Sequence, residues 1–149
     1  MTVEIVIRKL RPDERTDWEP LWKGYLDFYR TSAPKGTYDT TWTRLHDPDE
    51  PMGLLGAYVG GRLRGIVHFI YYRSCWTVGD YCYLQDLFVA EDARKLGLGR
   101  ALIEAVYQEA RAAGASRVHW LTHETNSTAR ALYDTLADRP GFIQYRKLF

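Results

Sequence analysis

The sequence predicts a mixed α/β protein with one domain, residues 1–149, built on a single central mixed, mostly antiparallel sheet flanked by helices. Apolar runs with the two-residue period of strands alternate along the chain with segments of helical period. Three of the expected strands follow one another through short connections, which makes them antiparallel. The chain has 149 residues, 46% of them hydrophobic and 26% charged, and this is the size and composition of one globular domain.

Each expected element has its own signal in the sequence. Residues 3–8 alternate between apolar and polar side chains, and Pro12 is suited to the first turn of a helix. The Gly60-Gly61 pair predicts a tight hairpin, Gly114 ends a helix, and Asn126 or Ser127 caps another. In chain order we expect a strand at 3–8, helices from 12 and over 38–45, strands at 53–59, 63–72 and 81–89, a helix from 97, a strand at 117–122, a helix from 126 or 127, and a strand at 142–148.

The first helix carries an aromatic stripe. Its residues Trp18, Trp22, Tyr25 and Tyr29 stand at i, i+4, i+7 and i+11. The stripe is better explained as a face that packs on the sheet. The other reading is that Trp22, Tyr25 and Tyr29, with Asp27 as a counter-charge, line a pocket that holds a cation.

Residues 83–102 organise the chain. An apolar strand ends there in a charged turn, and Gly97 and Gly99 precede a segment of helical spacing. Such a helix start leaves N–H groups unpaired and binds anions such as phosphate. Arg94, Lys95 and Arg100 crowd this end, where a helix alone would prefer acidic residues. A solvated basic turn is the other explanation, but the glycines favour a ligand site.

Two common phosphate loops do not fit this stretch. The string Gly-x-x-x-x-Gly-Lys-Ser/Thr is absent from the sequence, which excludes a Walker-type loop. A dinucleotide fingerprint needs Gly or Ala where Leu102 stands, and leucine is too bulky for the close packing of helix on strand.

The pattern Arg94-x-x-Gly97-x-Gly99, preceded by Leu87-Phe88-Val89, resembles the acetyl-CoA motif of the GNAT N-acetyltransferases. The resemblance covers roughly residues 80–145 and is closest to the yeast-type histone/polyamine acetyltransferase branch. Its further matches are Asn126, Ala129, Leu132-Tyr133 and Gly141-Phe142. The resemblance implies a sheet in which a splayed strand pair holds acyl-CoA. It also implies transfer of acetyl from acetyl-CoA to a primary amine.

The resemblance implies a set of site residues. Tyr133, seven residues after Asn126, matches the acid that protonates the leaving thiolate, although the same position also suits a core tyrosine. Polyamine acetyltransferases of this family have a glutamate where Gln85 stands, and a glutamine cannot accept the proton. Asp86, His123 and Glu124 are therefore the candidate bases, and catalysis through ordered water stays open. The implied cofactor-binding residues are Leu87, Phe88, Val89, Arg94, Lys95, Leu96, Gly97, Leu98, Gly99, Arg100, Asn126 and Tyr133. The candidate acceptor-binding residues are Trp22, Tyr25 and Tyr29 of the aromatic stripe, together with Asp27 and Gln85.

The acceptor is expected to be a small-molecule or peptide amine: a polyamine, an amino acid, an antibiotic amine or a protein lysine. A non-catalytic sensor of acyl-CoA is the alternative, which the presence of Tyr133 disfavours. The last expected strand leaves a free edge that a second copy could cover, so we expect a homodimer.

Composition and spacing exclude several other classes. A net charge of +1 predicts no nucleic-acid partner, and the apolar runs are too short to span a membrane. The N-terminus lacks signal-peptide features, so we expect a cytoplasmic protein. His119 and His123 with Glu124 fall on an expected strand rather than on a metal-binding helix, so no metal is expected. Cys75 and Cys82 are read as two thiols rather than a disulfide.

Overall fold

The structure is a computed structural model that describes residues 3–149. Five strands form one sheet in the order β1-β2-β3-β4-β5, in which β4 and β5 pair in parallel and all other neighbours are antiparallel. This confirms the predicted fold class. The elements are β1 (Ile5–Lys9), η1 (Pro12–Glu14), α1 (Arg15–Phe28), α2 (Lys35–Leu45), β2 (Met52–Val59), β3 (Arg62–Tyr72), β4 (Tyr81–Val89), η2 (Glu91–Ala93), α3 (Leu98–Ala112), β5 (Arg117–His119) and α4 (Ser127–Tyr133).

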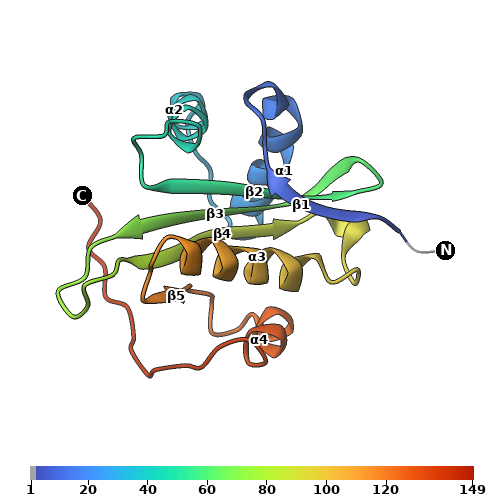
Figure 1. Ribbon diagram of the computed structural model, residues 1–149. Coiled ribbons are helices and arrows are strands. Elements are labelled where there is room, and N and C mark those ends of the chain that lie inside the picture. Colours follow the sequence, from blue (N-terminus) through green and yellow to red (C-terminus); the bar gives the residue numbers. More distant parts are fainter. Residues whose placement is uncertain (1–2) are drawn as a thin grey trace.

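Helices cover both faces of the sheet (Figure 1). Helices α1 and α2 pack on one face around Trp18, Trp42 and Ile66, all buried. Helix α3 packs on the other face through Leu98, Leu102, Ile103 and Val106, with the residues around α4 against the same cluster. The alternating pattern of the strands therefore supplies two separate apolar cores. Within residues 3–149, no helix is both long and apolar enough to cross a membrane.

Strands β4 and β5 stay together only over a short distance. Their pairing joins Tyr81–Tyr83 to Arg117–His119 and then stops. Two residues further on, β4 contains a bulge, because His68 pairs with Asp86 while Phe69 pairs with Leu84. The extra residue is Gln85, and a bulge of this kind bends the strand and redirects its side chains. The two strands separate at this point.

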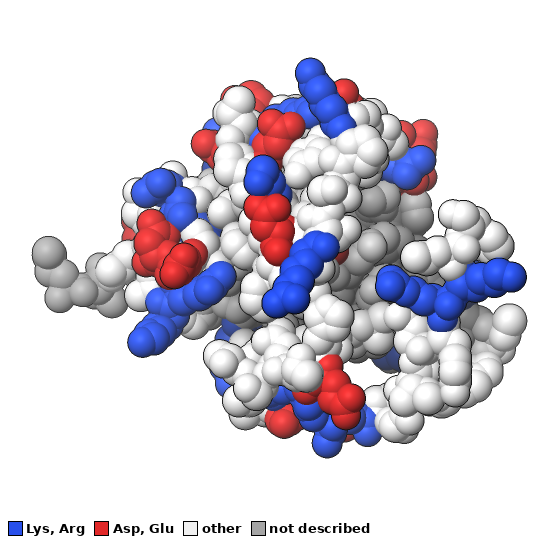
Figure 2. Space-filling model, turned by 180° about the vertical axis from the view of Figure 1, so that it is seen from behind, with Lys and Arg blue, Asp and Glu red and all other residues white. Residues whose placement is uncertain are grey.

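Two strand predictions fail for the same reason. The expected strand at 117–122 ends at His119, because β4 no longer lies beside the chain after that residue. The expected strand at 142–148 is wrong: residues 138–149 contain no regular secondary structure. A strand needs a neighbour for its N–H and C=O groups, and this segment runs apart from the sheet (Figure 1). From the opposite side it is separated from the body by an open gap (Figure 2).

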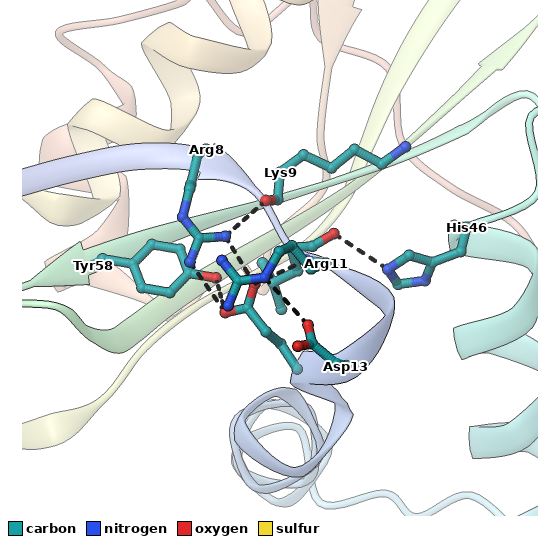
Figure 3. Close-up of polar contacts among 8 residues, drawn as sticks. Arg8, Lys9, Arg11, Asp13, His46 and Tyr58 are labelled. Atoms are coloured by element: carbon teal, nitrogen blue, oxygen red, sulfur yellow. Dashed lines mark hydrogen bonds and ion pairs between the residues drawn. The ribbon is translucent and has the colours of Figure 1, made fainter.

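A buried carboxylate ties β1 to the start of α1 (Figure 3). Glu14, only 5% exposed, accepts hydrogen bonds from Arg8 Nη1 at 2.8 Å, from the Arg11 backbone N–H at 2.9 Å and from the Tyr58 hydroxyl at 2.6 Å. The Arg8 guanidinium also lies 3.8 Å from the centre of the Tyr58 ring. The hydrogen bond from Arg8 lowers the pKa of Glu14 from 4.5 to about 2, against the opposing effect of burial.

This network makes stability depend on pH in a defined direction. A carboxyl whose pKa is lowered by folding stabilises the protein above its unfolded pKa, near 4.5, and the contribution is lost as the pH falls toward 2. At 1.36 kcal/mol per pKa unit the effect is about 3 kcal/mol. We expect Glu14→Gln to lower the free energy of unfolding by about 2–3 kcal/mol at pH 7 and by much less at pH 3, measured by urea denaturation.

Asp13→Asn is the matched control, because Asp13 is a carboxylate in the same turn whose ion pair with Arg11 Nε, at 3.2 Å, is exposed to solvent. We expect it to change the free energy of unfolding by less than about 0.5 kcal/mol. If the effect of Glu14→Gln were the same at pH 3 and pH 7, the network would act through packing and not through the charge.

Candidate active site

A hollow opens where β4 and β5 separate. Its walls come from α1, β4, α3, α4 and the chain that follows β5. The lining residues are Tyr25, Tyr29, Leu84, Gln85, Leu87, Ile103, Trp120, Leu121 and Tyr133. Beyond Tyr83, β4 still pairs with β3, but within residues 3–149 no strand pairs with its other edge. The backbone groups of 84–89 that point away from β3 therefore face this gap.

Tyr133 stands at the end of α4 and turns its ring into the hollow. The ring meets Trp120 edge-on, with the ring centres 5.4 Å apart. Burial, with a smaller contribution from Tyr29, raises the pKa of Tyr133 to about 12. The hydroxyl is therefore protonated at neutral pH and can donate a proton to an anion that forms beside it.

The aromatic stripe of α1 serves both of the roles considered for it. Trp18 and Trp22 are buried and stacked, with ring centres 5.3 Å apart. Tyr25 and Tyr29 lie further along the helix and line the hollow. The Tyr25 hydroxyl donates to the Gln85 backbone carbonyl at 3.2 Å. The N-terminal half of the stripe is thus core, and the C-terminal half is wall.

Asp86 lies behind this wall. Its Oδ2 accepts hydrogen bonds from His68 Nδ1 at 2.8 Å and from Trp22 Nε1 at 3.2 Å. His68 is itself held by Trp18, whose Nε1 lies 2.9 Å from His68 Nε2. Burial, with Asp86 as the next contributor, raises the pKa of Tyr25. The charge of the Asp86 carboxylate therefore acts on the Tyr25 hydroxyl.

The glycine loop has the backbone of an anion site. Lys95 and Gly97 both adopt left-handed φ angles, +71° and +79°. The first intrahelical hydrogen bond of α3 joins the Ala101 N–H to the Gly97 carbonyl at 3.0 Å, so the N–H groups just before it have no partner inside the helix. A Cβ added at Gly97 would meet nothing within 4 Å, so the surface here is open to a ligand.

The three cations of this loop differ in their surroundings. Arg94 Nε donates to the Val89 carbonyl at 3.3 Å. Arg100 Nη2 donates to Thr135 at 2.8 Å, while Lys95 is exposed. Leu98 points into the core at 1% exposure, so only its backbone can face a ligand.

Several predicted site residues lie elsewhere. Asp27 pairs with Lys23 at 2.9 Å on the exposed side of α1, and Trp22 is part of the core. Asn126 begins α4, but its amide donates to Thr122 Oγ1 at 3.1 Å and does not cap the helix. Glu124 is exposed, and its backbone carbonyl accepts from Arg130.

The remaining predicted positions lie nearer to the hollow. His123 is exposed, with its ring centre 5.2 Å from that of Tyr29. Phe88 packs on α1 at Gly24, whereas Leu87 and Val89 pack toward α3. No cluster of three metal-ligating side chains occurs in the part of the chain that the structure describes. Both cysteines are free thiols, Cys75 exposed and Cys82 buried.

The sequence reasoning missed His68 and the far wall of the hollow. A polar residue between Val67 and Phe69 in an apolar strand was a signal that a buried polar contact exists. Trp120 and Leu121 carried no such signal, because they follow β5 in a segment that was expected to be strand.

Comparison with known proteins decides the family. The model of the acetyltransferase (GNAT) family matches residues 18–137. The chain belongs to the acetyltransferase (GNAT) family. As a member, it is an acetyltransferase, and the predicted family resemblance is confirmed. A curated relative, the D-amino-acid N-acetyltransferase HPA3 of Saccharomyces cerevisiae, is 34% identical over 147 residues, which are 96% of this chain and 90% of that protein.

A second relative is the thialysine N-epsilon-acetyltransferase of Caenorhabditis elegans. It is 36% identical over 80 residues, or 54% of this chain and 49% of that protein. Among solved structures, the aminoglycoside N-acetyltransferase AAC(6')-Iy in complex with CoA superposes with a TM-score of 0.82 at 18% identity, covering 99% of this chain and 97% of that one. A ribosomal-protein-alanine N-acetyltransferase from Brucella melitensis gives 0.76 at 23% identity, covering 99% and 100%. These structures share the GNAT fold.

Proposed function

We propose that this GNAT enzyme transfers the acetyl group of acetyl-CoA to a primary amine of a small molecule, by direct attack within a ternary complex. The hollow between β4 and β5 carries the proposal, because the unpaired edge of β4 and the half-buried, protonated Tyr133 both face it. Relatives named for D-amino acids, thialysine and L-ornithine support an acceptor related to amino acids. Polyamines and protein lysines are the other candidate acceptors.

The loop that precedes α3 fits the pyrophosphate of acetyl-CoA. In this proposal the backbone N–H groups of residues 95–100 bind the phosphates, as a helix start with an open backbone surface allows. The free edge of β4 at 87–89 pairs with the pantetheine chain, and an N–H group there faces the thioester oxygen. Acceptor contacts come from Tyr25, Tyr29 and Gln85.

The chemistry needs one acid and a deprotonated amine. The amine nitrogen forms a bond to the acetyl carbon, the carbon–sulfur bond breaks, and Tyr133 gives its proton to the sulfur. The proton that the nitrogen loses as the amide forms restores the Tyr133 hydroxyl. The products are the acetamide and the CoA thiol. Asp86, His123 and Glu124 are the candidate bases, besides ordered water.

An acceptor panel tests the proposal. The purified chain is assayed for thiol release from acetyl-CoA with spermidine, D- and L-amino acids including ornithine, and a histone-tail peptide. We expect turnover with at least one small amine at several times the rate without acceptor. Acetyl-CoA binding without turnover on any acceptor would overturn the proposal and favour an acyl-CoA sensor.

We propose a homodimer in which a second copy covers the C-terminal segment. The apolar side chains of this segment are solvent-exposed: Phe142 by 78%, Tyr145 by 88% and Leu148 by 75%. An extended apolar segment that stands apart from its own domain (Figures 1 and 2) is stabilised when it packs on another chain. In keeping with the two free thiols, we further propose that the enzyme works in the reducing cytoplasm.

The dimer leads to a prediction for sedimentation. We expect the full chain to sediment as a dimer at micromolar concentration, and a variant that lacks residues 141–149 to sediment as a monomer. Serine at Phe142, Tyr145 and Leu148 together should weaken the dimer without shortening the chain. A full-length chain that stays monomeric at tens of micromolar would refute the proposal.

A further inference from the structure

Asp86 is held by more partners than a packing role requires. The residue is 8% exposed, and a single oxygen, Oδ2, accepts from both His68 Nδ1 at 2.8 Å and Trp22 Nε1 at 3.2 Å. His68 is 3% exposed, and Trp18, fully buried, lies 2.9 Å from its other nitrogen. Four side chains from three elements, α1, β3 and β4, thus form one hydrogen-bonded chain that ends at the carboxylate.

The donors in this chain fix where its protons lie. An indole N–H can only donate, so Nε2 of His68 must accept from Trp18. The proton of the neutral imidazole is therefore on Nδ1, where it donates to Asp86. The two N–H groups aimed at one of its oxygens hold the Asp86 side chain in one orientation.

The second oxygen of Asp86 is the open end of the chain. Within residues 3–149 no hydrogen bond ends on Oδ1, and 12% of the side chain remains exposed. Tyr25 lines the hollow from α1, and its hydroxyl lies 3.2 Å from the backbone carbonyl of Gln85, the residue before Asp86. The carboxylate also contributes to the raised pKa of that tyrosine. Tyr29 on α1, Tyr83 on β4 and His68 on β3 are the other titratable groups around this point.

We propose that Tyr25 and Asp86 remove the proton from the acceptor's ammonium group, and that His68 is the positioning residue that holds Asp86. This inference rests on the proposed function. The Tyr25 oxygen accepts a proton from the ammonium, while its own hydroxyl proton turns from the Gln85 carbonyl, to which it is donated in this structure, and passes to Asp86. The ammonium and the carboxylate become a neutral amine and a carboxylic acid, and Tyr25 is unchanged.

Two features make this transfer reasonable. Gln85, which lines the hollow from β4, cannot accept a proton, so the base lies elsewhere. An acceptor that fills the hollow loses the water around its ammonium group, and this favours the neutral amine. Asp86 itself does not line the hollow, which is why Tyr25 is needed as the group that touches the acceptor.

The pH dependence of kcat/KM tests the relay, with the best acceptor of the panel. An alkyl amine has a pKa near 10, so at pH 7 only about one molecule in a thousand is the free base. Wild-type enzyme uses the ammonium form, and its kcat/KM should stay nearly flat between pH 7 and 9. In Asp86→Asn and Tyr25→Phe only the free base reacts, so kcat/KM should rise about tenfold per pH unit and approach the wild-type value near pH 10.

Histidine variants separate positioning from packing. His68→Asn keeps an N–H group beside Asp86 and should retain a flat profile, whereas His68→Leu should acquire the slope. His46→Leu is the matched control, because His46 also packs on a tryptophan, Trp42, but bonds only backbone carbonyls away from the hollow. We expect its profile to be flat. Melting with and without acetyl-CoA shows that each variant folds and binds its co-substrate.

The outcomes are distinct. Asp86→Asn and Tyr25→Phe profiles that run parallel to wild type, with the same loss at every pH, would show a structural role and overturn the relay. If Asp86→Asn fails to fold, Tyr25→Phe, which removes one hydroxyl, decides alone. Absence of turnover by wild type on every amine would refute the proposed function itself, which is a different result.

Discussion

Replacing Tyr133 with phenylalanine is expected to lower kcat by about 10²–10⁴-fold, the usual contribution of a general acid. The side chain keeps its ring and loses only the hydroxyl, whose raised pKa, about 12, keeps it protonated over the working pH range. The KM for acetyl-CoA should change much less, because the proposed pyrophosphate and pantetheine contacts come from backbone groups elsewhere. Steady-state kinetics with thiol detection measures both parameters.

Tyr107→Phe is the matched control for this substitution. Tyr107 lies on α3 near the same Trp120, and its hydroxyl donates to the Leu136 carbonyl at 3.0 Å, but it does not line the hollow. We expect it to cost some stability and to leave kcat within about threefold, as a structural hydroxyl should. If Tyr133→Phe behaved in the same way, melting lower but turning over normally, Tyr133 would be a core residue and not the acid.

Replacing Gly99 with valine is expected to abolish the rise in melting temperature that acetyl-CoA gives the wild type. At a concentration of 100 Kd a ligand stabilises the folded state by about 2.7 kcal/mol, which is roughly 5–10 °C for a domain of this size. Gly99 lies in the first turn of α3, where the phosphates are proposed to approach the backbone. A branched side chain there blocks that approach.

The structure shows why Gly99 tests this better than Gly97. A Cβ at Gly99 would lie 3.5 Å from Leu132 Cδ2, an ordinary contact, whereas Gly97 has a φ of +79°, which strains any other residue. Gly36→Val is the control, since a Cβ at that helical position meets nothing within 4 Å. It should lose a similar small amount of helix stability and keep the full acetyl-CoA shift. A normal shift in Gly99→Val would show that the loop is not the phosphate site.

Local patterns were sufficient for most of the secondary structure. The expected strand at 81–89 has the bounds of β4, and the helix after Gly97 is α3. These elements form where the apolar period, the glycines and the short connections agree, so neighbouring residues alone specify them. The family motif could be recognised for the same reason. Arg94, Gly97 and Gly99 lie close together in the chain, in the loop before α3 and its first turn.

The sequence by itself determined the fold class, the GNAT family and the turn that begins α3, since each depends on residues close together in the chain. Only the tertiary structure decided how distant segments meet. It placed His68 and Trp18 behind Asp86, Trp120 against Tyr133, and Asp27 outside the hollow. It also left 142–148 without a strand neighbour, because pairing depends on which backbone lies alongside, and neither β propensity nor alternation encodes that.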